Sequence, residues 1–279
     1  MMDWKPRHIC ASIIFLVFCL GGPSLALANS STLAALSDAE SEYEFVQTRT
    51  CTPFSSPYQC NPGEEPLPVQ WYRHQVEYEI HQAGSEQLHP GQDLTDDVKH
   101  AIIESFDAWN EPDCSDFEMI YAGKTVSDFV GWNDQIAAED NFNLILWQDD
   151  HWPYTQNAIA LTTVTFSTNT GEILSADVEF NSAQHDFTNS DDNVQVDLRN
   201  TLTHEVGHFL GLDHSPNSQA TMFATAPVGE TAKRTLHDAD IAGLCYIYSD
   251  DWWESTPENG GGSSGGGSDD NGHPYCCFK

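Results

Sequence analysis

Positive charge is scarce in this chain, whose 279 residues include 10 Lys and Arg against 43 Asp and Glu, for a formal net charge of −33 at pH 7. Nucleic acids and anionic membrane surfaces are bound mainly through clustered Lys and Arg. The composition therefore argues against both as partners. Most of the acidic residues are expected to form a solvated surface, and bound cations are the alternative use for some of them.

The chain also lacks an apolar run long enough to cross a bilayer, which takes about 20 residues as a helix. The apolar run at residues 9–20 is shorter, follows two basic residues and precedes Ala26-Leu27-Ala28. This pattern is typical of a secretory signal peptide, which we expect to span residues 1–28 and to be cleaved after Ala28. The sequence thus predicts a secreted, extracellular protein without membrane insertion.

Cysteine is sparse as well, with eight residues in the chain. Two of them lie in the expected signal peptide, so an even set of six remains in the mature protein. In an oxidising compartment an even set predicts disulfides. Cys51 and Cys60 flank a short loop that contains proline, and we expect them to pair. Cys114 is expected to meet Cys245. Six cysteines allow 15 connectivities, so these pairings are hypotheses.

The remaining residues divide into three parts, and no internal repeat is present. Residues 29–50 are polar and acidic and predict a short pro-segment or flexible arm. Residues 51–255 are expected to form one globular domain, and residues 256–279 a linker rich in Gly and Ser with a short tail that contains cysteine.

Apolar periodicity predicts both strands and helices in the globular part. Alternation at Val76, Tyr78 and Ile80 indicates a half-buried strand within residues 71–80. Further strands are expected at residues 117–121, 142–147, 158–166 and 173–180. Helices are expected after Thr95, over residues 196–211, and over residues 238–248 with Thr235 and Asp238 as a capping box.

One stretch carries chemistry: His204-Glu205-Val206-Gly207-His208-Phe209-Leu210-Gly211-Leu212-Asp213-His214. On a helix, His204 and His208 project from the same face, so both imidazoles can bind one ion. Gly211 can adopt positive φ, which lets the helix end there and the chain return with His214 as a third ligand. Three protein ligands leave a tetrahedral position for water, as in catalytic zinc sites.

Glu205 lies beside these ligands and is the candidate general base for a water molecule that zinc acidifies and that then attacks a peptide carbonyl. A short HExxH string also arises by chance on helices. The third histidine, Gly211 and the downstream Met222 make the match longer than that string.

This stretch resembles the metzincin clan of zinc metalloproteases, whose motif HExxHxxGxxH it matches. Ser215, directly after the motif, resembles the residue that the matrixin family has at this position. Met222 looks like the methionine that forms an apolar floor beneath the metal in that clan. The resemblance implies an α/β (α+β) metzincin-like domain over roughly residues 66–250. Such a domain has a twisted, mostly parallel sheet with an antiparallel edge strand, three main helices and zinc in a cleft. It also implies protein or peptide substrates, which add as a strand to residues 158–166.

Two features depart from that family. The sequence Arg49-Thr50-Cys51-Thr52-Pro53 matches the matrixin pro-segment motif poorly, so a disulfide is favoured for Cys51 over a zinc-blocking thiolate. Glu179 stands where matrixins often have a histidine for a second, structural zinc, so one zinc is expected. His151 and His185 are extra ligand candidates of lower rank. Calcium is an alternative for six carboxylates: Asp149, Asp150, Asp177, Glu179, Asp191 and Asp192.

The sequence therefore predicts a secreted zinc endopeptidase with one catalytic zinc. The alternative is a zinc-containing binding or adhesion protein that keeps the fold without turnover. The presence of Glu205 favours the enzyme. No pattern indicates the oligomeric state.

Overall fold

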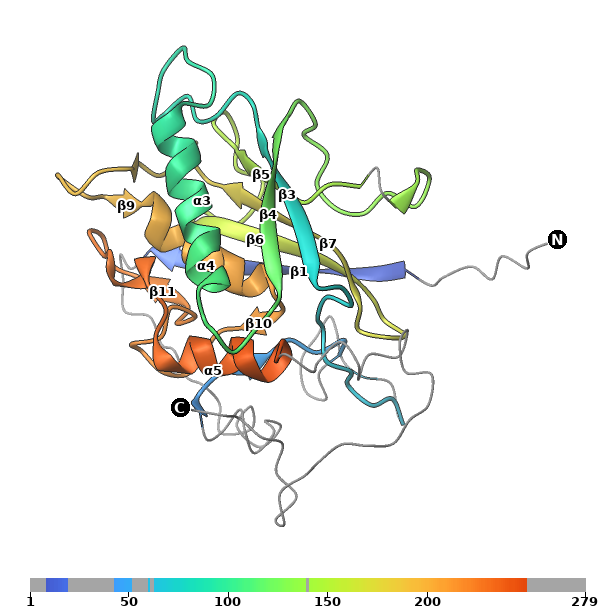
Figure 1. The fold of residues 1–279 in the computed structure, drawn as a ribbon. Helices are drawn as coiled ribbons and strands as arrows, with labels where there is room; N and C mark the ends of the chain where they lie inside the picture. Colours follow the sequence, from blue (N-terminus) through green and yellow to red (C-terminus); the bar gives the residue numbers. More distant parts are fainter. Residues whose placement is uncertain (1–8, 20–42, 52–59, 61–62, 139–140, 250–279) are drawn as a thin grey trace.

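The computed structural model describes residues 9–19, 43–51, 60, 63–138 and 141–249. A twisted sheet forms its centre, and the two longest helices lie together on one side of it (Figure 1). The helices are α3 (Asp96–Asn110), α4 (Leu198–Phe209) and α5 (Asp238–Ile247), with a 3-10 turn η2 (Ala232–Arg234). None of the helices in these residues is long and apolar enough to span a membrane.

The large sheet has the strand order β11-β1-β6-β7-β5-β3-β4. Its strands are β1 (Ile9–Cys19), β3 (Gln75–His81), β4 (Glu118–Thr125), β5 (Leu144–Trp147), β6 (Ala158–Ser167), β7 (Ile173–Phe180) and β11 (Thr225–Ala226). Strands β4, β3, β5 and β7 run parallel, and β6 runs antiparallel to β7. The mostly parallel sheet with an antiparallel strand beside it agrees with the fold predicted from the sequence.

Strand β1 covers the outer edge of β6. It pairs antiparallel from Ile9 opposite Ser167 to Phe18 opposite Ala158, and its end pairs parallel with β11. An uncovered edge presents unpaired backbone N–H and C=O groups, which an extended segment can satisfy. The edge expected to be free for substrate thus carries a strand of the same chain. Residues 1–8 and 20–28 of the expected signal peptide lie outside the described residues, and cleavage on export stays a prediction.

The last residues of the expected flexible arm differ from the prediction. Strand β2 (Val46–Gln47) pairs with β10 (Leu212–Asp213) in a small sheet directly after α4. Phe45 is buried beside Tyr246, and the Ser215 hydroxyl donates to the carbonyl of Glu44 at 2.5 Å. The polar composition concealed this anchor, because its backbone pairs with residues more than 160 positions away. Residues 29–42 lie outside the described part of the chain.

The core holds α4 through polar groups of buried aromatic side chains. Trp71 Nε1 donates to the Phe209 carbonyl at 2.9 Å, and the Tyr248 hydroxyl donates to Leu210 at 2.7 Å. Trp109, on the buried face of α3, donates from Nε1 to the Thr203 carbonyl at 2.8 Å. Because the three aromatic rings are almost fully buried, their hydrogen bonds hold α4 in place at its middle and at its C-terminal end.

The other helix boundaries follow the sequence prediction closely. Thr95 is the N-cap residue of α3, although its side chain makes no capping hydrogen bond. The predicted capping box of α5 at Thr235 and Asp238 was wrong. His237 accepts from the Ala239 N–H, and Asp240 accepts from the His237 N–H. The box begins two residues later because a histidine nitrogen accepts the bond that a hydroxyl was expected to accept.

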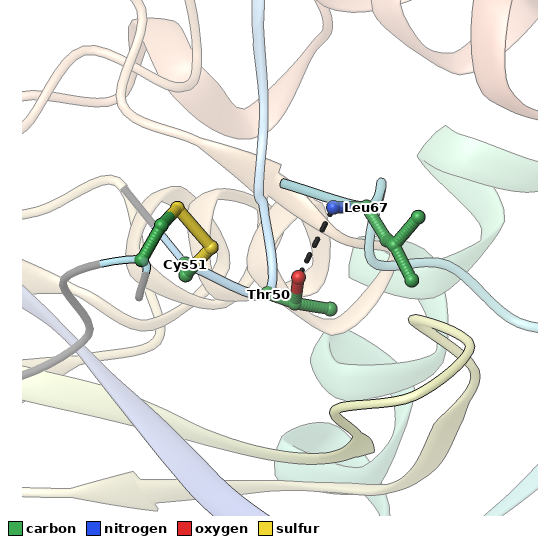
Figure 2. The surroundings of a disulfide bond; sticks show 4 residues. Thr50, Cys51 and Leu67 are labelled. Carbon is green, nitrogen blue, oxygen red and sulfur yellow. Dashed lines mark hydrogen bonds between the residues drawn. A yellow bond between two sulfur atoms is a disulfide. The ribbon is translucent and has the colours of Figure 1, made fainter. Parts of the chain in front are cut away.

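Two disulfides are present among the described residues, one closing a short loop and one joining distant parts of the chain, and both match the expected pairings. Cys51 is bonded to Cys60, next to a hydrogen bond from the Leu67 N–H to the Thr50 hydroxyl at 3.1 Å (Figure 2). Cys114, shortly after α3, is bonded to Cys245 in α5. The predicted linker and cysteine-containing tail, residues 256–279, lie outside the described residues.

Candidate metal centre

Helix α4 carries the first two histidines of the motif and starts at a strong capping residue. Asp197 ends strand β9 (Val196–Asp197), which pairs with β8 (Phe187–Thr188), and its carboxylate accepts from the Asn200 N–H at 2.8 Å. Arg234 donates to both oxygens of the same carboxylate. A negative charge at the start of a helix stabilises the helix through its dipole, so this cap fixes where α4 begins.

The structure brings the three motif histidines together. His204 Nε2 lies 3.1 Å from His208 Nε2, which lies 3.2 Å from His214 Nε2. Their ligand atoms all lie within 4.8 Å of one another. Among the described residues, these three histidines are the group whose geometry could hold a metal ion.

The other ring nitrogens determine which atoms face the centre. His204 Nδ1 lies 2.6 Å from the Thr221 carbonyl oxygen, and His208 Nδ1 lies 2.8 Å from the Leu212 carbonyl oxygen. A carbonyl only accepts, so each Nδ1 carries the proton and each Nε2 presents a lone pair. Lone pairs at 3.1–3.2 Å repel each other unless a cation lies between them. The donor set therefore fits one divalent metal ion.

Burial keeps these imidazoles neutral. It lowers the pKa of His204 and of His208 well below the ordinary value, and it also lowers the pKa of His214. Neighbouring positive charge on Lys233 acts in the same direction on all three, whereas Asp213 raises the pKa of His214. Neutral imidazole is the form that binds metal, so the pocket favours binding at neutral pH.

Two glycines make the arrangement sterically feasible. Gly211 has φ +97, and a Cβ there would lie 2.2 Å from the Val69 carbonyl oxygen, so no other residue fits the turn that returns His214. At Gly207 a Cβ would lie 2.1 Å from Met222 Sδ. Met222 is buried directly against α4 at this point, and its role as the apolar floor of a metal site stays a prediction.

Asp240 holds the turn that carries Met222, a role that sequence reasoning missed. Its carboxylate accepts from the Thr221 N–H at 2.7 Å and from the Met222 N–H at 3.0 Å, besides capping α5. Thr221 in turn offers its carbonyl to His204. Asp240 therefore orients the candidate ligand His204 through one intervening residue.

Glu205 is fully buried between α4 and β6. The Thr162 hydroxyl, on β6, donates to Glu205 Oε2 at 2.5 Å, while Oε1 has no hydrogen-bond partner among the described residues. Burial raises the pKa of Glu205 to about 8, and the Thr162 bond and the Lys233 charge lower it. A metal cation nearby would further favour the carboxylate. One oxygen is thus held and the other is available.

Lys233 is a second residue that sequence reasoning missed. Its side chain is buried and its ammonium donates to the carbonyls of Phe223 and Thr225, on either side of the start of β11. Burial lowers the pKa of Lys233 to about 8. Lys233 belongs to no sequence motif, so no role was predicted for it. Its ammonium group holds the segment that follows Met222 in place.

The remaining candidates are not part of the histidine group, and among the described residues they form no metal-binding group of their own. Glu179 accepts from Gln148 Nε2 at 2.7 Å and from the Tyr154 hydroxyl at 3.0 Å. Asp149 accepts from Ser85 and Glu86, and Asp191 from Arg234. Asp150, Asp192 and His151 are exposed, and His185 is half-buried. Asp177 accepts two backbone N–H groups. The six carboxylates do not converge as calcium ligands would.

Comparison with known proteins agrees with this geometry. The family model described as Matrixin matches residues 70–249. Metalloendoproteinase 2-MMP of Arabidopsis thaliana is 40% identical over 53 residues, which is 19% of this chain and 14% of the relative. Metalloendoproteinase 1 of Glycine max is 37% identical over 70 residues, 25% of this chain and 23% of the relative.

Neutrophil collagenase of Homo sapiens is 26% identical over 152 residues, 54% of this chain and 29% of the relative. The matched parts therefore span less than a third of these relatives' length. The family model, however, covers more than half of this chain, including the sheet from β3 onward, α4 and all three histidines. The chain belongs to the matrixin family.

Proposed function

We propose that this protein is a secreted zinc endopeptidase with Glu205 as its general base. The observation that carries the proposal is the convergence of three imidazole Nε2 atoms beside a buried carboxylate with one free oxygen. The names of the relatives, metalloendoproteinases and a collagenase, support the same reaction class.

The residues at the site have separate roles in the proposed peptide hydrolysis. His204, His208 and His214 would hold the ion, which would supply an acidified water and a Lewis acid for the scissile carbonyl. Glu205 would accept the proton of that water through Oε1 and return it to the leaving amine. The Thr162 hydroxyl keeps Oε2 in place, so the carboxylate does not rotate away from the water. Met222 and the core of α4 exclude solvent from beneath the ligands.

The substrate binds as an extended strand along β6, between β6 and β11. This is supported by β1, which occupies that edge with backbone pairing to both strands. Thr162 lies opposite Phe15 in that register, so the strand passes over the catalytic carboxylate. Removal of residues 1–28 on export would free the edge, and N-terminal sequencing of the exported protein tests this step. The disulfides Cys51–Cys60 and Cys114–Cys245 are consistent with an oxidising compartment.

Glu205→Ala tests the function. We expect zinc to stay bound, because the three imidazoles remain, and turnover to fall by about 10²–10⁴, because the water loses its proton acceptor. The measurement is casein cleavage by both proteins at equal zinc occupancy. Ser218→Ala, downstream of the motif and outside the ligand set, is the control.

Near-equal cleavage rates would remove Glu205 from the mechanism. A wild-type protein that holds zinc and binds unfolded protein, yet cleaves none after export, would support the non-catalytic binding protein instead. Metal analysis in the same experiment reports whether a second zinc is held. One zinc per chain is our expectation, because the side-chain partners of Glu179 are Gln148 and Tyr154.

A further inference from the structure

The three motif histidines differ in how their rings are held. His204 and His208 each direct Nδ1 at a backbone carbonyl oxygen, at 2.6 and 2.8 Å. Among the described residues, Nδ1 of His214 has no such carbonyl partner. The position of the His214 ring therefore depends on the backbone that leads to it, which is strand β10.

Strand β10 lies against a segment from much earlier in the chain, residues 44–48, which we call the strap. Strand β2 belongs to the strap and pairs antiparallel with β10. The Thr48 N–H donates to the Gly211 carbonyl oxygen at 2.8 Å, directly before β10. The Ser215 hydroxyl donates to the Glu44 carbonyl oxygen at 2.5 Å, directly after the third histidine. The strap thus holds the returning chain on both sides of that ligand.

Glu44 has a backbone conformation that residues other than glycine seldom adopt, with φ +60. Such a conformation persists where the surrounding contacts hold it in place. Here the Ser215 hydroxyl holds the Glu44 carbonyl, and Asn217 Nδ2 donates to Glu44 Oε2 at 2.9 Å. Both contacts come from the loop that follows the third histidine. The strap and this loop therefore fix each other.

Phe45 anchors the strap to the core. Its ring lies 5.2 Å from the ring of Tyr246 in α5, measured between centroids. A Cβ added at Gly243 in α5 would lie 3.2 Å from Phe45 Cβ and 2.9 Å from Leu212 Cδ2. Phe45 and Leu212 thus pack side by side over the same bare part of the helix. Loss of the Phe45 ring would remove the support of both the strap and β10.

The other end of the strap is tied to the residues that enter the domain. The Val69 N–H donates to the Thr48 carbonyl oxygen at 2.8 Å, and the Thr50 N–H donates to the Leu67 carbonyl oxygen at 2.9 Å. The match to the matrixin family model begins at residue 70. The strap therefore lies outside the part of the chain to which the family match assigns a role.

We propose that the strap, residues 44–48, is a positioning element of the metal centre that sets the place of the third ligand, His214, through β10. Strand β10 also supplies the carbonyl that faces His208, so the strap supports this ligand to a lesser degree. His204, in contrast, faces the carbonyl of Thr221, in a different loop. The inference rests on the zinc centre of the proposed function and does not require peptide hydrolysis.

The experiment measures the zinc affinity of the exported protein in two backgrounds that each keep two of the three ligands, His204→Ala and His214→Ala. Phe45→Ala loosens the strap in each background and in the parent, and Phe45→Leu is the conservative variant. Affinity is measured by zinc titration against a competing chelator. The absorption spectrum of Co²⁺ bound in place of zinc reports the ligand geometry.

Two further variants keep the comparison interpretable. Met119→Ala is the control for a general loss of stability, because Met119 and Phe45 are each 3% exposed and Met119 lies on β4, which pairs with β3. Ser215→Ala removes the hydrogen bond to Glu44 alone. It gives the same comparison in both backgrounds if Phe45→Ala does not fold.

With all three histidines present, Phe45→Ala should weaken zinc binding about tenfold, as is usual when a group that orients a ligand is lost. We expect the same loss in His204→Ala, whose remaining ligands both depend on β10. In His214→Ala the loss should be about threefold or less, because the ligand that the strap positions is absent. The Co²⁺ spectrum should change in Phe45→Ala and return in Phe45→Leu. Met119→Ala should bind zinc as the parent does.

Equal losses in the two backgrounds would overturn the positioning role, because an effect on general stability does not distinguish one ligand from another. Unchanged zinc affinity in Phe45→Ala would overturn it as well. Failure of the parent protein to bind zinc would instead overturn the metal centre and the proposed function with it. A parent that binds zinc but cleaves no casein would overturn the endopeptidase activity alone and leave the affinity comparison valid.

Discussion

Glu205 and Asp177 are both fully buried carboxylates. They lie on opposite faces of the strand pair β6 and β7, and their oxygens differ in how they are hydrogen-bonded. Burial raises the pKa of each to about 8. Asp177 accepts a backbone N–H on each oxygen, whereas Glu205 has a partner on one oxygen only. A buried carboxylate with both oxygens satisfied holds structure in place. One with an oxygen left over is able to exchange a proton with a third group.

The largest effect is expected from removing the metal that makes Glu205 useful. His208→Ala should lose zinc and activity together, because one of three protein ligands is gone and the remaining pair no longer encloses the ion. Zinc content after dialysis and casein cleavage are the measurements. His185→Ala is the control, since His185 lies outside the cluster. Zinc retained at full occupancy in His208→Ala would contradict the assignment.

Asp240 sharpens the comparison, because it is a buried carboxylate that holds structure beside the candidate metal centre. Asp240→Asn turns one acceptor into a donor that faces a backbone N–H, which should cost about 1–3 kcal/mol of unfolding free energy. Zinc affinity should also fall, since Thr221 orients His204. Chemical denaturation and zinc titration measure the two effects. Asp238→Asn, exposed in the same turn of α5, should change neither. Wild-type zinc affinity in Asp240→Asn would show that the turn does not depend on this carboxylate.

Asp177 should give an effect that is seen only in how stability depends on pH. Its pKa is raised by burial from 3.8 to about 8, against the lowering effect of the Gly131 and Leu144 N–H groups. The folded protein therefore binds a proton that the unfolded chain has released, so this group makes stability fall as pH rises from about 4 to 8, by at most about 1.4 kcal/mol per pH unit. Asp177→Asn should show a shallower fall between pH 6 and 8 in urea denaturation. Parallel curves for the two proteins would mean that Asp177 is ionised throughout that range.

The metal centre was predictable because its information is local. His204, Glu205, His208, Gly211 and His214 lie within eleven residues, and helical spacing alone sets two ligands on one face. The apolar steps of α3 and the alternation in β3 are local in the same way. Met222 followed from its position after the motif, and the structure explains its contact through Gly207.

The supports of the site were not predictable from spacing. Thr162 reaches Glu205 across 43 positions, and the pairing of Gln47 with Leu212 joins residues that are 165 positions apart. Neither contact produces a periodic pattern in the sequence, because strand pairing is set by the whole sheet rather than by neighbouring residues.

The Cys114–Cys245 bridge has a consequence for the integrity of the molecule. It encloses 131 positions, including the exposed β4–β5 loop, β6, α4 and the three histidines. The proposed endopeptidase would meet other copies of itself in concentrated solution, and exposed loops are the segments most open to nicking. A cut within residues 126–138 would leave two fragments that the sheet and this bridge hold together. Such nicked protein would keep its metal ligands, migrate as one chain without reductant, and separate into two pieces once the bridge is reduced.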